Sequence, residues 1–188
     1  MVGCGGDAPP NPSPTPLPPA PPLPAPIQTI AEFTSGRTTG GGGIPPLVLG
    51  QSVTIRQGPF NSLRFSWQRS VGQPSATGRV FLLSQEYLGP VADLSTSVDG
   101  FVAASTSVVD DEYVFDNTIT VQPGTRYWFY TNDQTATLLS SDGRQDLYAD
   151  GEMYVSGDGN RFAVFYTTMQ RTDPHDANFV LRGRAVSR

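Results

Sequence analysis

Lysine is absent from the 188 residues of this chain, and cysteine and histidine occur once each. A single cysteine cannot form a disulfide within the chain, so side-chain packing has to hold the fold together. A single histidine leaves little material for the common metal centres or for a Ser-His-Asp triad. No apolar run approaches the roughly 18 residues that a membrane-spanning helix requires. These absences favour a folded domain without catalytic chemistry.

The histidine lies in the sequence RTDPHDAN, where Asp173, His175 and Asp176 form a candidate metal-binding loop. The same composition is typical of a solvated turn before a strand, which is the interpretation we favour. Sequence motifs for a nucleophile elbow, a zinc protease or a phosphate-binding loop are missing. Paired carboxylates, as in glycosidases, stay open at this stage. We therefore expect no enzyme and no resident cofactor.

Negative charge is concentrated in the middle of the chain. Residues 93–158 contain twelve acidic and two basic side chains, a net charge of −10, whereas the whole chain carries −5. Carboxylates in loops are the ligands that Ca²⁺ prefers, but none of these loops has an EF-hand spacing. Calcium is thus a candidate ligand, and solubility is the simpler explanation. The acidity argues against a nucleic-acid partner, because such proteins present a basic surface.

Proline is concentrated at the start of the chain. Eleven of the 18 prolines lie in residues 1–26, a stretch without aromatic residues. Proline fixes φ and removes a backbone donor, so this stretch can form neither a helix nor a central strand. We expect an extended tail over residues 1–26 and one folded domain over residues 27–188.

The only cysteine, Cys4, stands in the sequence VGCGG directly before the prolines. This arrangement resembles the lipobox and tether of bacterial lipoproteins. The resemblance implies that the Cys4 thiol carries a lipid, that a membrane is a partner, and that the protein lies at the outer membrane or cell surface. Lipoprotein precursors have a basic and apolar leader before the cysteine, whereas only three residues precede Cys4 here. A free thiol in a disordered tail is the alternative.

The remainder of the chain has the pattern of β-strands. In SLRFSWQ, Leu63, Phe65 and Trp67 alternate with polar residues, and EYVFDNTITV (residues 112–121) and NFVLRGRAV (residues 178–186) alternate in the same way. Further strands are expected near residues 28–34, 51–57, 79–85, 99–105, 125–132, 146–155 and 161–169. About ten short strands predict an all-β antiparallel β-sandwich of the jelly-roll type.

Two short elements resemble those of bacterial extracellular jelly-roll domains that are similar to carbohydrate-binding modules. They are a strand with Gln51 and Ser52, and the stretch Pro123-Gly124-Thr125 followed by Tyr127 and Trp128. The resemblance spans about residues 47–135 and implies the fold far more than any function.

The aromatic sequence RYWFY supplies the candidate ligand-binding residues. Strand alternation places Arg126, Trp128 and Tyr130 on one face and Tyr127 and Phe129 on the other. If the first face is exposed, its rings and guanidinium suit stacking on a sugar. The alternative is that Trp128 packs under a loop or in a second core layer.

The sequence thus predicts a non-catalytic, surface-anchored module for binding or adhesion, with glycans as candidate ligands. The alternative is a structural decoration or spike protein of a virus-like particle, in which the proline-rich segment docks on neighbouring subunits. Surface or particle proteins are the corresponding candidate partners.

Overall fold

The computed structural model describes residues 1, 3, 23–34, 48–68, 75–132, 148–156, 161–165 and 176–186. The lipobox-like Cys4, most of the proline-rich segment and the candidate metal ligands Asp173 and His175 lie outside these ranges. The expected tail over residues 1–26 and the lipid attachment site therefore stay predictions. The first strand begins at Ile27.

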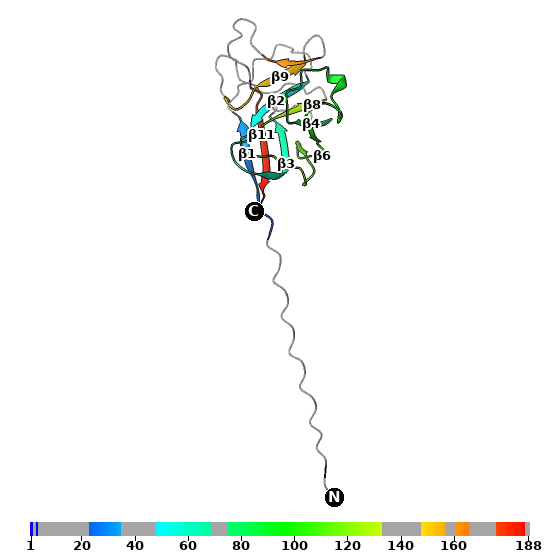
Figure 1. Cartoon of the computed structure of the whole chain (residues 1–188), viewed down its shortest axis with the longest axis vertical. Helices are drawn as coiled ribbons and strands as arrows, with labels where there is room; N and C mark the ends of the chain where they lie inside the picture. Colours follow the sequence, from blue (N-terminus) through cyan, green and yellow to red (C-terminus); the bar gives the residue numbers. More distant parts are fainter. Residues whose placement is uncertain are drawn as a thin grey trace.

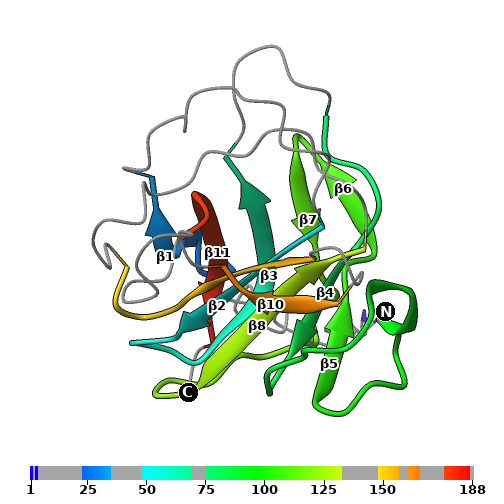
Figure 2. The same cartoon turned by 90° about the horizontal axis from the view of Figure 1, so that it is seen from above.

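The described residues form two antiparallel sheets that face each other (Figures 1 and 2). The five-stranded sheet has the order β1-β11-β3-β7-β6, and the six-stranded sheet has the order β10-β9-β2-β8-β4-β5. The strands are β1 (Ile27–Phe33), β2 (Leu49–Thr54), β3 (Phe60–Trp67), β4 (Val80–Leu83), β5 (Phe101–Ala104), β6 (Ser107–Val109), β7 (Glu112–Val114), β8 (Arg126–Thr131), β9 (Met153–Ser156), β10 (Phe162–Val164) and β11 (Phe179–Ala185).

The strand order confirms the predicted jelly roll. Four antiparallel pairs, β1 with β11, β2 with β8, β3 with β7 and β4 with β5, nest inside one another along the chain. This is the pairing expected when one long antiparallel hairpin folds over into two facing sheets, as in a jelly roll. Successive strands β1 to β4 alternate between the sheets. The hairpin of β6 with β7 and the hairpin of β9 with β10 extend this framework at the sheet edges.

The main core lies between the two sheets. The alternation predicted for β3 is confirmed, because Leu63, Phe65 and Trp67 are buried while Arg64 and Ser66 point outward. The Phe65 ring stacks on Phe129 of β8, with 4.6 Å between the ring centroids. Aromatic side chains from opposite sheets therefore meet at the centre of the molecule.

Two turns account for two of the differences between the predicted and observed strands, and the strands expected near 146–155 and 161–169 are shorter in the structure, as β9 and β10. The expected strand over residues 112–121 ends at Val114, because Asp116 Oδ1 accepts bonds from the Thr118 N–H (2.8 Å) and hydroxyl (2.6 Å) and bends the chain. The unexpected strand β6 joins β7 through Asp110 and Asp111, which both have positive φ. Positive φ at both central residues is the requirement of a type I′ hairpin turn, which aspartate tolerates.

Helix is nearly absent from the described part of the chain. A single 3-10 turn, η1 (Val91–Asp93), interrupts the connection between β4 and β5. None of the helices described reaches the length and apolarity of a membrane span.

Candidate binding surface on the six-stranded sheet

Strand β8 divides the predicted aromatic residues between two environments. Tyr127 and Phe129 point into the main core between the sheets, whereas Trp128 and Tyr130 pack against a second apolar cluster on the outer face of the six-stranded sheet. Arg126 lies on the same outer face, beside Thr54 of β2. The three candidate ligand residues therefore share one face, as the alternation predicts.

They do not form one open platform, because Tyr130 is fully buried. Its ring is covered by Tyr87 from the connection that follows β4 and by Phe162 of β10, with centroid separations of 6.1 and 4.6 Å. Its hydroxyl accepts a hydrogen bond from the Tyr87 backbone N–H at 3.0 Å. Tyr130 is thus a structural residue of the second cluster, and the expectation that it stacks on a ligand is wrong because no part of its ring is exposed.

A glycine on β2 makes room for this second cluster. Gly50 lies between Tyr130 of β8 and Tyr154 of β9, whose rings approach edge to face at 5.6 Å. A Cβ atom at Gly50 would lie only 2.4 Å from the Tyr130 ring. The outer face is therefore apolar and covered at the Tyr130 end of β8.

The face becomes polar beside Trp128, where the side chains of four residues meet. We call this group the Trp128 cluster: Trp128, Tyr154, Glu86 and Glu152. The Tyr154 hydroxyl is its hub. It accepts a hydrogen bond from the Trp128 indole N–H at 3.1 Å and lies 2.9 Å from Glu86 Oε1 and 3.3 Å from Glu152 Oε2. Trp128 and Glu152 are partly buried, and Glu86 is exposed.

The hydroxyl of Tyr154 carries one proton for two carboxylates. Burial raises the pKa of Tyr154 well above its usual value of 10.0; the Trp128 bond opposes this shift, and the bond to Glu86 reinforces it. The hydroxyl therefore stays protonated near neutral pH and serves one carboxylate at a time. The two carboxylates of the Trp128 cluster therefore have more acceptor sites than the single Tyr154 proton can fill.

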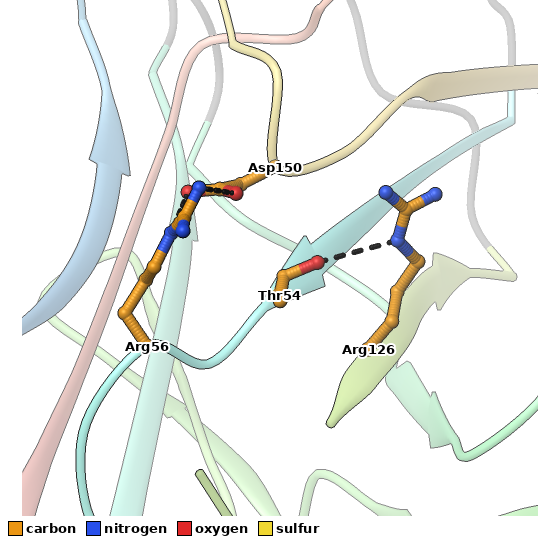
Figure 3. A network of polar contacts seen from close by, with 4 residues as sticks. All are labelled: Thr54, Arg56, Arg126 and Asp150. Atoms are coloured by element: carbon orange, nitrogen blue, oxygen red, sulfur yellow. Dashed lines mark hydrogen bonds and ion pairs between the residues drawn. The ribbon is translucent and has the colours of Figure 1, made fainter. Parts of the chain in front are cut away.

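Two arginines lie near the end of β2, beside Thr54: Arg126 and Arg56 (Figure 3). Arg126 donates from Nε to the Thr54 hydroxyl at 3.3 Å. Arg56, just beyond the end of β2, forms a two-pronged ion pair with Asp150, in which Nε donates to Oδ2 at 2.8 Å and Nη2 to Oδ1. Both arginines lie close enough to Tyr148 to influence its hydroxyl electrostatically. Donors therefore lie beside the acceptors of the Trp128 cluster.

Three of the described aspartates have structural partners. Asp116 closes the turn at Thr118, and the bonds from the Thr118 hydroxyl and N–H hold the pKa of its carboxyl below the usual value. Asp111 Oδ1 accepts the Ala76 N–H at 2.8 Å, and the buried Asp176 accepts the Tyr148 N–H at 3.1 Å. Within the described ranges, no three His, Cys, Asp or Glu side chains group as metal ligands. Two of the acidic loops to which the calcium hypothesis applies, at residues 140–146 and 156–160, lie outside the described ranges except for Ser156.

Sequence reasoning did not single out Glu86, Glu152 or Tyr154. Tyr154 is separated from Glu86 by 68 positions, and only the pairing of β9 with β2, and of β2 with β8, brings it beside Trp128. No family model, curated protein or solved structure matches this chain.

Proposed function

We propose that this chain is a non-catalytic binding and adhesion module that recognises a glycan through the Trp128 cluster, with Arg126 at its border. The observation that supports the proposal most is the convergence of two carboxylates on one hydroxyl, beside a partly buried indole. Glycans present many O–H donors, and these can bond to the lone pairs of the Glu86 and Glu152 carboxylates that the Tyr154 hydroxyl leaves unfilled. The indole offers a flat apolar surface for a sugar ring.

The arrangement favours binding over glycosidic hydrolysis. Retaining and inverting glycosidases place the scissile bond between two carboxyl groups. In the Trp128 cluster, the Tyr154 hydroxyl lies within hydrogen-bonding distance of both carboxylates and fills the space between them. A sugar can therefore lie above Glu86 and Glu152 but not between them.

The first prediction concerns the ligand contacts. Glu152→Gln keeps the shape of the side chain but removes its charge, and we expect it to weaken glycan binding about tenfold, since a hydrogen bond to a charged group contributes roughly 1.5–3 kcal/mol. Trp128→Leu should weaken binding at least as much by removing the stacking surface. An array of neutral and acidic oligosaccharides identifies the ligand, and calorimetry measures the affinities.

Glu32→Gln is the matched control, because Glu32 is an exposed carboxylate on β1 of the other sheet. It should bind like the wild type. Unchanged affinity in both Glu152→Gln and Trp128→Leu would place the site elsewhere, and a wild-type protein that binds no oligosaccharide would exclude the glycan.

The second prediction concerns attachment. We propose that Cys4 is acylated and anchors the module at the outer membrane or cell surface, on the basis of the VGCGG sequence before the prolines. Two acyl chains anchor a protein stably, whereas one is marginal. The intact mass of protein isolated from the cells that make it should correspond to a chain that begins at Cys4 and carries lipid. A chain that begins at Met1 with a free thiol would contradict this and favour the virus-like particle alternative.

A further inference from the structure

Charge is unbalanced at the Trp128 cluster. Its two carboxylates, Glu86 and Glu152, lie 2.9 and 3.3 Å from the same Tyr154 hydroxyl. Within the described part of the chain, neither carboxylate forms an ion pair with an arginine. Burial and these two carboxylates raise the pKa of Tyr154, and the opposing influence is the bond from the neutral Trp128 indole. Two negative charges are therefore held close together around a single proton donor.

Two other carboxylates show how the fold compensates such charge elsewhere. Glu112 accepts bonds from Arg64 at 3.1 Å and from Arg182 at 2.9 Å, and Asp150 pairs with Arg56. The side chains of Glu112 and Asp150 are 12% and 23% exposed, so arginine neutralises both of these partly buried groups. Like charges held close together repel each other, and a cation beside them removes that cost. At the Trp128 cluster, a cation from outside the described chain can supply this compensation.

The cluster is accessible and its geometry is fixed by the sheet. Glu86 is exposed, and Glu152 and Trp128 are partly exposed. The Glu152 backbone N–H donates to the Ser52 hydroxyl at 2.9 Å, and Ser52 is the cross-strand partner of Trp128. The indole N–H is bound to the Tyr154 hydroxyl at 3.1 Å, which orients the ring. The charges and the ring are thus positioned before a ligand arrives, which lowers the entropy cost of binding.

We propose that the glycan bound at this site is an amino sugar, whose protonated amine lies against Glu86 and Glu152 beside the Trp128 ring. This inference rests on the proposed function, since it names the class of sugar for the same site. An ammonium group brings several N–H donors and a positive charge, and its hydrogen bonds to carboxylates are charge-assisted. The face of an indole also attracts a cation within about 6 Å. A neutral sugar supplies donors without the charge, and the carboxylates repel an acidic sugar.

The test compares two probes with the same sugar backbone, a hexamer of glucosamine and a hexamer of N-acetylglucosamine. Calorimetry with the full chain, in a mildly acidic buffer that keeps the amines protonated, measures both affinities. The wild type should bind the glucosamine hexamer at least tenfold more tightly than the acetylated one. Glu86→Gln and Glu152→Gln should each reduce this preference to threefold or less, because each removes one of the two charges that face the amine. Their thermal unfolding curves should stay close to that of the wild type.

Glu32→Gln is again the matched control. It removes the same charge from an exposed site on the other sheet, so it should keep the wild-type preference. This control matters because the chain carries a net charge of −5 and attracts any polycation to some extent.

Three results would overturn the assignment of an amino sugar. The wild type binds the two hexamers equally well, it binds neither of them, or Glu32→Gln loses the preference as strongly as Glu86→Gln does. The last result would indicate general attraction to an acidic protein. The proposed glycan function would still stand if a neutral oligosaccharide bound to the wild type and Trp128→Leu weakened that binding. Failure of this inference is therefore distinguishable from failure of the glycan site itself.

Discussion

Phe129→Ala is expected to lower the free energy of unfolding by about 3–5 kcal/mol, the usual cost of removing a buried aromatic ring. Phe129 is fully buried between the two sheets. Its ring stacks on Phe65 at 4.6 Å and meets Phe115 edge to face at 6.2 Å, so it joins aromatic residues of opposite sheets. The alanine variant leaves a cavity at the centre of the main core. The two sheets cannot readily move together to fill this cavity.

Trp128→Ala provides the comparison, since it changes the next residue of the same strand. Trp128 is only partly buried, and it packs at the border of the second cluster with its indole N–H on Tyr154. We expect this variant to lose less stability than Phe129→Ala. Urea unfolding at 25 °C measures both. Equal losses would show that Trp128 is a core residue and would contradict its role as a ligand contact.

Gly151→Ala is expected to have the other large effect. A Cβ atom at Gly151 would lie 1.7 Å from the Ser52 carbonyl oxygen, a backbone atom that cannot turn aside. The segment around Gly151 is bound to β2 by hydrogen bonds from Ser52 N–H to Glu152 O (2.9 Å) and from Thr54 N–H to Asp150 O (2.8 Å). The methyl group would force this segment away from β2. We expect a loss of about 3 kcal/mol, at the upper end of the range for overpacking.

Gly124→Ala is the control that separates the steric clash at Gly151 from the general cost of replacing a glycine by alanine. Gly124 has φ +76° in the turn after Pro123, and a Cβ atom added there would meet no other atom within 4 Å, so its substitution costs only backbone strain, about 1–2 kcal/mol. The difference between the two variants in urea unfolding is the cost of the contact with Ser52. A Gly151→Ala protein as stable as the wild type would show that this segment does not lie against β2.

The sequence predicted the fold well where a strand has one buried face. Leu63, Phe65 and Trp67 alternate strictly with polar residues, and such a period defines both the strand and its inner face. The turn at Pro123 and Gly124 was also predictable, because a type II turn needs positive φ at its third residue and Gly124 has φ +76°.

The second cluster corresponds to the alternative that the sequence left open, in which Trp128 packs under a loop or in a second core layer. A signal for it exists in β4, whose four residues VFLL are all buried. A continuous apolar run without alternation is typical of a strand covered on both faces. Phe81 of this strand is the cross-strand partner of Tyr130. The run thus indicated that the outer face at Tyr130 is covered.

The Trp128 cluster could not be predicted from the sequence. Glu86 comes from a connection after β4, and Glu152 and Tyr154 come from the β9 region. None of the three stands in a motif with Trp128. Their meeting depends on the register of β2 between β8 and β9, which aligns Ser52 with Trp128 and Gly50 with Tyr154. Such long-range pairing is fixed by the folded sheet and not by local pattern.

The most direct measurement of the proposed binding surface uses the indole N–H signals of the ¹⁵N-labelled protein in a titration with the glycan selected on the array. The chain has two tryptophans, so two such signals arise. Trp67 is 4% exposed and its indole nitrogen is buried in the main core. The Trp128 indole N–H donates to the Tyr154 hydroxyl inside the Trp128 cluster. We predict that the Trp128 signal shifts to saturation while the Trp67 signal stays in place. A glycan that binds and leaves the Trp128 signal unmoved would contradict the proposed site.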